Sequence, residues 1–169
     1  MVLLGFASAL RRSELVALEV DDVEFGADGA RLRIRRSKGD PEGAGEAVGV
    51  LATGTATCPV AALQAWLRAA GIASGPVFRS LDRHGNLRSR MNGEAVAMAV
   101  QRRAAMAGLD PAGFSAHSLR AGLATSAAAA GVQEADIQRQ TRHKSVQVLR
   151  GYVRHGSLLR SNASGAVGL

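Results

Sequence analysis

Apolar side chains recur at helical spacing over residues 2–18, which predicts one or two short helices at the start of the chain. After residue 18 the spacing of the apolar residues shifts towards every second position. Residues 31–35 alternate arginine with leucine or isoleucine after the turn-forming residues 26–29, and this pattern predicts an antiparallel hairpin. A glycine-rich turn over residues 39–45 leads to residues 46–50, which we expect to add a third strand. Three strands suffice for a small sheet with one buried face.

The rest of the chain is predicted to be mainly helical. Pro59 suits the first turn of a helix that Gly71 ends. Residues 71–91 carry Gly-Pro and Gly-Asn pairs and four arginines, a composition that predicts a surface loop. Helices are expected to resume over residues 92–108, 117–131, 133–141 and 145–155, followed by a tail or short helix over residues 157–169. The predicted fold class is therefore mainly α with a small three-stranded antiparallel β-sheet (α+β).

The chain has 169 residues, of which 47% are hydrophobic and 21% charged, which is typical of one folded domain and excludes wholesale disorder. Its net charge of +7 and its pI near 11.1 favour a polyanionic partner such as nucleic acid. Cys58 has no second cysteine to pair with, which fits a reducing cytosol. No apolar run reaches the roughly 20 residues that a membrane-spanning helix needs, so we expect a soluble, cytoplasmic protein without a membrane partner.

Two pairs of residues place a basic side chain three positions from a second polar group. Arg11 and Glu14 would share one face of a helix, as would His117 and Arg120. Each pair has an ordinary alternative. An exposed ion pair at this spacing contributes only about 0.2–0.5 kcal/mol, and a histidine near a helix start is more often a capping or core residue. Neither pair alone therefore establishes a site.

Two further residues stand out by their type. Lys38 is one of two lysines beside 19 arginines, and lysine, unlike arginine, can release its proton near neutral pH once its pKa is lowered. A solvated turn is the alternative. Tyr152, the only tyrosine, follows His143 by nine residues. A phenol can attack phosphorus, but its pKa near 10 requires a base or positive charge nearby, which His117 and the arginines can supply. The alternative is a core tyrosine with its hydroxyl at the edge.

Taken together and in this order, these residues resemble the tyrosine recombinase (phage integrase) family. The family's Arg-x-Ser-Glu-Leu box matches residues 11–15, and its His-Ser-Leu-Arg box matches residues 117–120. Its strand-turn lysine matches Lys38, and its late histidine and nucleophilic tyrosine match His143 and Tyr152. Independent matches in the right order are much more specific than any single motif.

The sequence departs from the family's pattern at a few places. Ala9 stands where the family usually has glycine, and Thr141-Arg142 stands where Leu-Gly commonly precedes the late histidine. Neither change removes a catalytic group. Family members also carry an N-terminal helical DNA-clamping domain that has no counterpart here. We therefore expect residues 1–169 to form a single catalytic domain, truncated at its N-terminus.

The resemblance implies metal-independent cleavage and rejoining of DNA strands through a 3′-phosphotyrosine intermediate, as in site-specific recombination. Arg11 and Arg120 would hold the non-bridging oxygens of the scissile phosphate. Tyr152 would attack the phosphorus, with His117 as the proton acceptor and Lys38 as the general acid for the departing 5′-oxygen.

Two more residues would support this reaction. His143 would hydrogen-bond a phosphate oxygen, and Glu14 would orient Arg11 or His117 rather than act as an acid or base. No cofactor or metal is expected, because the sequence has no HExxH motif, no paired cysteines and no carboxylates clustered beside its histidines.

The resemblance also implies double-stranded DNA as the partner and a location at the nucleoid. The protein would be a monomer in solution and a homotetramer on paired DNA sites, with Leu158 and Leu159 as candidates for the contact between neighbours. Arginines that we expect to contact DNA phosphates are Arg35, Arg36, Arg88, Arg90 and Arg142.

Three other functions remain open at this point. A truncated remnant of a recombinase could bind DNA without cleaving it. A type IB topoisomerase shares the chemistry of a tyrosine with arginines but relaxes supercoils instead of exchanging partners. A basic helical domain that binds nucleic acid without specificity would not need Tyr152 at all. The target sequence and the type of rearrangement do not follow from one sequence.

Overall fold

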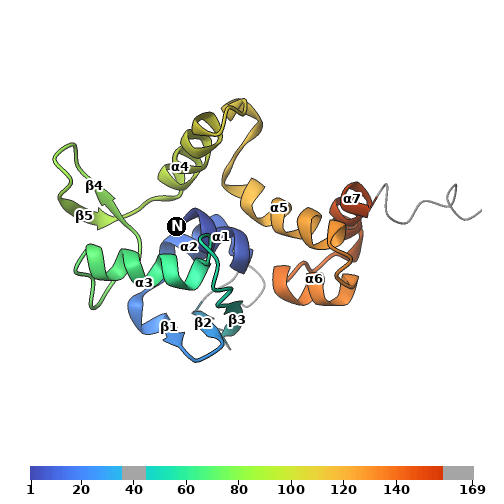
Figure 1. The fold of residues 1–169 in the computed structure, drawn as a ribbon, viewed down its shortest axis with the longest axis horizontal. Helices are drawn as coiled ribbons and strands as arrows, with labels where there is room; N and C mark the ends of the chain where they lie inside the picture. Colours follow the sequence, from blue (N-terminus) through green and yellow to red (C-terminus); the bar gives the residue numbers. More distant parts are fainter. Residues whose placement is uncertain (36–44, 158–169) are drawn as a thin grey trace, which may run out of the picture.

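In the computed structural model, residues 1–35 and 45–157 are described, and they confirm the predicted fold class (Figure 1). Helices are combined with a three-stranded antiparallel sheet and a two-stranded ribbon. The chain begins with α1 (Val2–Ser8) and α2 (Arg12–Ala17), so the prediction of one or two short helices from the apolar spacing is confirmed, with two helices present. Among the described residues, no helix is both long and apolar enough to cross a membrane.

The predicted three-stranded sheet is also confirmed. After a 3-10 turn (Val20–Asp22), its strands are β1 (Val23–Phe25), β2 (Gly29–Ile34) and β3 (Glu46–Leu51), in the order β1-β2-β3. Leu32 in the central strand lies opposite Val23 on one side and Val48 on the other. The strict alternation of β2 buries its apolar residues and exposes its arginines, which gives the sheet one core face.

The surface loop predicted over residues 71–91 is wrong in part, because this segment forms an antiparallel ribbon. Its strands are β4 (Arg79–Leu81) and β5 (Leu87–Arg90). Asp82 organises the connection by accepting hydrogen bonds from the backbone N–H groups of His84 and Asn86, both at 2.9 Å. Arginine and serine fill five of the seven strand positions, so no alternation of apolar and polar residues marks this segment as strands.

The remaining helices begin close to where the sequence predicted them. They are α3 (Pro59–Ala69), α4 (Gly93–Met106), α5 (Ala116–Ala129), α6 (Glu134–Thr141) and α7 (Val146–Ser157), with a 3-10 turn at Pro111–Gly113. Asn92 and Ser115 cap α4 and α5, because each side-chain oxygen accepts a backbone N–H of the first turn. The predicted tail over residues 157–169 lies almost wholly outside the described residues.

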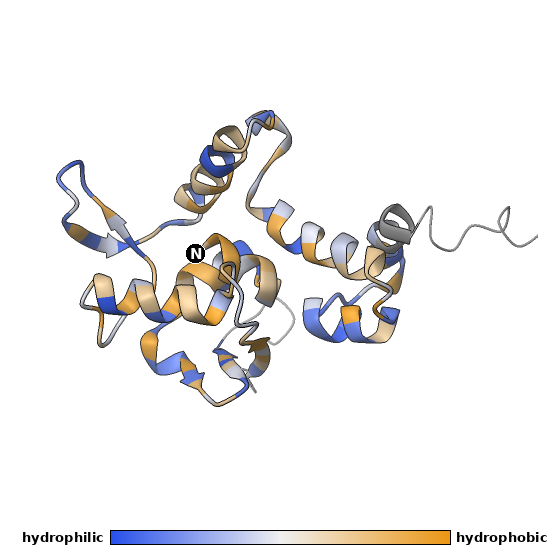
Figure 2. Ribbon diagram, viewed as in Figure 1, coloured by the Kyte–Doolittle hydropathy of each residue, from blue (hydrophilic) through white to orange (hydrophobic). Residues whose placement is uncertain are grey.

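Two groups of buried side chains hold these elements together. The larger joins α1, α2, α3 and the sheet around Leu4, Leu15 and Leu32. The smaller joins α5, α6 and α7 around Ala124, Ala128, Ile137 and Leu149. Figure 2 shows that the helices of the two groups differ in hydropathy: α1 is mostly orange (hydrophobic), whereas α6 is mostly blue (hydrophilic). The molecule therefore has one large core and a small satellite core at the far end of α5.

Helices α1 and α5 approach each other closely and link the two cores. A Cβ atom on Gly5 would lie 2.8 Å from Leu119 Cδ1, and one on Gly122 would lie 3.0 Å from Phe6 Cε2. These glycines leave room for the facing side chains, so α5 packs against the start of the chain. This contact brings the N-terminal end of α5 beside the connection between α1 and α2.

Candidate active site

The site is built first from the tight connection between α1 and α2. Ala9 adopts a left-handed conformation (φ 51°) and turns the chain so that Arg11 becomes the N-cap of α2. Glu14 accepts hydrogen bonds from the Arg11 backbone N–H and from Arg11 Nη1, both at 2.7 Å. The first of these bonds is the half of a capping box in which the carboxylate at N3 accepts the N–H of the N-cap residue, and it fixes the backbone of Arg11. Glu14 thus contacts Arg11, one of the two residues that it was expected to orient.

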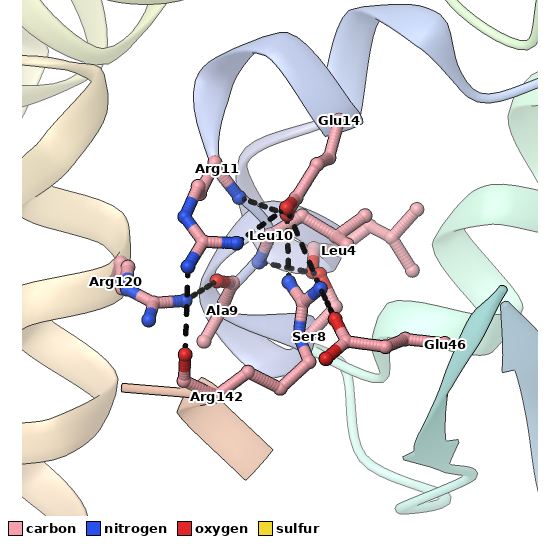
Figure 3. A network of polar contacts seen from close by, with 9 residues as sticks. All are labelled: Leu4, Ser8, Ala9, Leu10, Arg11, Glu14, Glu46, Arg120 and Arg142. Atoms are coloured by element: carbon pink, nitrogen blue, oxygen red, sulfur yellow. Dashed lines mark hydrogen bonds and ion pairs between the residues drawn. The ribbon is translucent and has the colours of Figure 1, made fainter. Parts of the chain in front are cut away.

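Glu14 is a buried carboxylate, with a side chain that is only 2% exposed. Burial alone would raise its pKa, but hydrogen bonds from Arg142 and Arg11 outweigh burial and lower the pKa below its ordinary value. Glu14 therefore stays charged at neutral pH. It serves as a fixed anion around which arginine side chains are arranged (Figure 3).

Arg120 approaches the same connection from α5. Its guanidinium is buried, and Nη1 donates a hydrogen bond of 2.8 Å to the Ala9 carbonyl oxygen. Burial, followed by the positive charges of Arg11 and Arg142, lowers the pKa of Arg120 to about 10. Arg120 is still charged at neutral pH, and Figure 3 shows its guanidinium close to that of Arg11. Two neighbouring guanidinium groups of this kind attract a phosphate or another anion.

A pocket opens where these arginines meet the first turn of α5. Its lining includes Arg11, Arg120, His117 and Ser115. His117 lies in this first turn, and its Nε2 is 2.8 Å from the hydroxyl oxygen of Tyr152 on α7. A neutral histidine at this distance can accept the phenolic proton. The structure thus brings a phenol, a potential base and two guanidinium groups together from three separate parts of the chain.

His143 lies beside the same tyrosine, with ring centroids 5.8 Å apart. Burial, followed by the positive charges of Arg120, His117 and Arg11, lowers the pKa of His143 to about 4. The ring is therefore neutral at pH 7. Its Nδ1 lies 2.7 Å from the hydroxyl oxygen of Thr141, whose own proton is donated to the Ile137 carbonyl. Neutral His143 accordingly carries its proton on Nδ1.

The five arginines expected on DNA fall into three groups. Arg35, Arg88 and Arg90 lie at the surface, where they form ion pairs with Asp22, Asp82 and Glu19 respectively. Arg36 lies outside the described residues, as does Lys38. Arg142 turns inward instead. Its side chain is 9% exposed and its guanidinium binds Glu14 and Glu46, so this geometry does not direct it at DNA.

Sequence reasoning overlooked Glu46 and Thr141. Glu46 begins β3 and binds Arg142 across the fold, 96 positions away in the chain. Nothing in the local sequence of Glu46 indicates this contact. Thr141 has a weak signal, because it directly precedes Arg142-His143 and is completely buried although polar. Among the described residues, no group of three or more His, Cys, Asp or Glu side chains is placed to hold a metal ion.

Comparison with known proteins identifies the class to which this fold and site belong. The structure matches XerA recombinase with a TM-score of 0.71 and 22% identity, covering 99% of this chain and 55% of XerA. It matches XerH site-specific recombinase, bound to a palindromic difH substrate, with a TM-score of 0.71 and 19% identity over 98% of this chain and 44% of XerH. The Tn1549 transposon integrase in complex with transposon right end DNA gives a TM-score of 0.64. The chain therefore has the fold of a tyrosine recombinase catalytic domain.

The sequence itself establishes the family. The model of the phage integrase family matches residues 1–157. A curated relative, the "integrase/recombinase xerD homolog" of Selenomonas ruminantium, is 41% identical over 165 residues, which cover 96% of this chain and 48% of that protein. The chain belongs to the phage integrase family. It spans about half the length of the relative it matches.

Proposed function

We propose that this domain cleaves and rejoins double-stranded DNA through a covalent tyrosine intermediate, as part of site-specific recombination. The observation that carries this proposal is the 2.8 Å contact between His117 Nε2 and the Tyr152 hydroxyl, beside the guanidinium groups of Arg11 and Arg120. A merely structural tyrosine needs neither a base nor an anion-binding pocket at its hydroxyl group. The names of the relatives, which are recombinases and integrases, support the same reaction.

In the proposed reaction the scissile phosphate binds between Arg11 and Arg120. Both side chains carry a positive charge that is already in place before the substrate arrives, so little reorganisation is needed as charge builds on the non-bridging oxygens. Arg120 is held by the Ala9 carbonyl and Arg11 by Glu14. The remaining N–H groups of the two guanidinium forks bind the phosphate oxygens.

In the chemical step one proton moves within the protein, from Tyr152 to His117, and a second leaves it, from Lys38 to DNA. Tyr152 Oη attacks the phosphorus and His117 Nε2 accepts the phenolic proton, while the bond between phosphorus and the 5′-oxygen breaks. Lys38, from the segment outside the described residues, protonates the departing 5′-oxygen. The product is a 3′-phosphotyrosine and a free 5′-hydroxyl. Attack of a 5′-hydroxyl on the phosphotyrosine reverses these transfers and reseals DNA without ATP.

His143 completes the proposed phosphate site as a hydrogen-bond donor. Its Nδ1 proton is directed to Thr141, so donation to a phosphate oxygen requires a second proton on Nε2. A bound phosphate supplies negative charge that offsets the arginines, and this raises the pKa of His143 from about 4. We therefore infer that DNA binding is accompanied by proton uptake at His143.

The wider assembly follows from this reaction. Exchange of strands between two duplexes requires four protomers, so we propose a homotetramer on paired sites formed from monomers, with the segment over residues 157–169 and its Leu158-Leu159 pair contacting a neighbour. Residues 1–169 act as the catalytic domain. Surface arginines that we propose as phosphate contacts are Arg35, Arg36, Arg88 and Arg90. Such contacts set affinity and salt dependence rather than sequence preference. Action on chromosomal or mobile DNA would place the protein at the nucleoid.

The decisive experiment is detection of a covalent adduct between the protein and DNA on a denaturing gel. The substrates are nicked duplexes from the DNA that flanks the gene, and the Tyr152→Phe variant is the matched control because it retains the ring but not the hydroxyl. We expect an adduct with the native chain and none with the variant. DNA binding without an adduct, repeated with a chain extended at its N-terminus, would instead support a non-catalytic binding remnant.

A further inference from the structure

Arg142 occupies an unusual backbone position at the end of α6. It adopts a left-handed conformation (φ 56°, ψ 41°), and Ala9 is the only other non-glycine residue with positive φ among the described residues. Its backbone N–H donates to the Gln138 carbonyl oxygen at 2.7 Å and so ends the helix. A residue with a Cβ atom is strained at such a position, whereas glycine is not. The side chain must therefore offset this strain by what it contacts.

The guanidinium of Arg142 bridges two carboxylates from different elements. Nη2 is 2.6 Å from Glu14 Oε2 on α2, and Nη1 is 3.0 Å from Glu46 Oε2 at the start of β3 (Figure 3). Nη1 also lies 3.4 Å from Glu14 Oε1. Arg142 Nε is buried and, within the part of the chain that the structure describes, no hydrogen-bond partner is present for it.

This arrangement is poorly suited to stability alone. The side chain combines a strained backbone, desolvation of a charged group and one unpaired N–H, and buried ion pairs often contribute less than apolar residues of the same size. The bridge instead fixes the position of Arg11. Glu14 binds Arg11 and Arg142 at once, and the Arg142 carbonyl oxygen lies 3.4 Å from Arg11 Nη2. Both the side chain and the backbone of Arg142 therefore act on Arg11.

We propose that Arg142 is a positioning residue that keeps Arg11 directed at the scissile phosphate by sharing Glu14 and by presenting its own carbonyl. Through Glu46 it also fixes the start of β3, which directly follows the segment that carries Lys38. This inference rests on the proposed function, since it deepens the role of the same site. It also replaces the DNA contact that the sequence predicted for Arg142.

The sharing of Glu14 has a clear electrostatic consequence. With Arg142 present, the two carboxylate oxygens divide between two guanidinium groups. Without Arg142, Glu14 has Arg11 as its remaining cationic partner, and the two side chains can form a bidentate pair. That pair would draw Arg11 away from the phosphate. Removal of Arg142 should therefore weaken binding of the transition state more than binding of DNA.

The test compares Arg142→Gly with Arg139→Ala in the adduct assay. Glycine adopts the left-handed conformation freely, so Arg142→Gly removes the bridge without adding strain. Arg139 lies on the same helix, is exposed and pairs only with Asp136 among the contacts described, which makes it a matched control for loss of one arginine. We expect Arg142→Gly to slow cleavage at saturating DNA by about 10- to 100-fold, with little change in Kd, and Arg139→Ala to leave cleavage unchanged. Arg142→Lys should restore part of the rate.

A neutral substrate separates positioning from a general structural defect. When a methyl group replaces one non-bridging oxygen, the scissile linkage has no negative charge for Arg11 to hold. The difference between the native chain and Arg142→Gly should then shrink strongly. An equal defect on both substrates would overturn the proposal, because it would show that Arg142 does not act through the phosphate charge.

A readout without catalysis distinguishes failure of this inference from failure of the proposed function. Nitrogen-15 NMR of the arginine side chains reports the environment of Arg11 directly. Arg142→Gly should shift the Arg11 Nε–Hε signal, and Arg139→Ala should not. An unchanged Arg11 signal in Arg142→Gly overturns the inference whatever the cleavage activity. A shifted signal in a chain that forms no adduct would keep the inference about Arg11 and reject only the proposed reaction.

Discussion

Arg11 and Tyr152 come from regions of the molecule with very different cores. Arg11 follows α1 and begins α2, both of which are packed into the large core with the sheet and α3. Tyr152 packs against the small core of α5, α6 and α7. The largest fully buried aliphatic side chain of this core is Leu149. Arg11 is thus anchored in a more extensive core than the nucleophile Tyr152.

Polar contacts compensate for this difference at the boundary between the two cores. Arg120 binds the Ala9 carbonyl, and Gln140 donates to the carbonyl oxygens of Ala7 and Gly49 at 2.8 and 3.0 Å. The Arg142 bridge lies in the same boundary. Because such contacts are directional, they can set the placement of Tyr152 where apolar packing is sparse. The comparison predicts that the two regions respond differently to substitution.

The largest effect is expected from Arg120, which touches both regions and the proposed phosphate. Arg120→Ala should lower the single-turnover rate of adduct formation by about 10²- to 10³-fold, because a preorganised donor to the developing charge is lost. Arg120→Lys keeps the charge but not the planar fork, so an intermediate rate is expected. Thermal unfolding measured alongside identifies any loss of fold. A folded Arg120→Ala variant that cleaves at the native rate would contradict the assignment of this residue to the phosphate.

The two cores can be compared directly by truncating one leucine in each. Leu32 and Leu149 are both completely buried, in the large and the small core respectively. We expect Leu32→Ala to lower the free energy of global unfolding by about 2–5 kcal/mol. Leu149→Ala should instead loosen α6 and α7 locally, so that amide hydrogen exchange speeds up there and adduct formation falls, with less change in Tm. Equal global destabilisation by both variants would refute the idea of two separately anchored regions.

The two regions also differ in how much of their structure the sequence could predict. The sheet was predicted because β2 alternates strictly, and α1 and α2 were predicted because apolar residues recur there at helical spacing. The ribbon of β4 and β5 was overlooked because arginines occupy its strands. The first half of the chain carries strong periodic signals, whereas the Ala-rich second half predicts helices but not how they pack.

For the candidate site, motif order predicted which residues matter but not how they contact each other. The family motifs pointed to Arg11, His117 and Tyr152. In the structure Arg11 and His117 line one pocket, and His117 lies within hydrogen-bond distance of Tyr152. The inward turn of Arg142 did not follow from sequence, because it depends on Glu46, which is remote in the chain. A long-range ion pair leaves no local pattern, and a surface arginine is the ordinary expectation for that residue type.

A smaller effect is expected from the close approach of α1 and α5. A methyl group on Gly5 would lie 2.8 Å from Leu119 Cδ1 and 3.1 Å from Leu15 Cδ2, both of which are ends of flexible side chains. Gly5→Ala should therefore lower the free energy of unfolding by about 1–2 kcal/mol after the gain in helix propensity is included. Chemical denaturation measures this change. Gly151→Ala is the control, because a Cβ atom there meets nothing within 4 Å. An increase in stability for Gly5→Ala would show that the two helices can separate without cost.

The smallest effect concerns pH and the region of the nucleophile. Burial and neighbouring positive charges lower the pKa of folded His143 to about 4, so between that value and the ordinary histidine pKa the unfolded chain binds more protons than the folded one. Stability from this group is therefore present at neutral pH and is lost as the pH falls towards 4. His143→Gln should flatten the decline of Tm over that range by on the order of a few degrees. Glu14, whose pKa is lowered, contributes stability above its ordinary pKa and loses this contribution as the pH falls through the lowered value. If His143→Gln and the native chain show the same Tm profile between neutral pH and about pH 4, burial and the neighbouring positive charges do not hold the ring neutral. The proposed proton uptake on DNA binding would then fail as well.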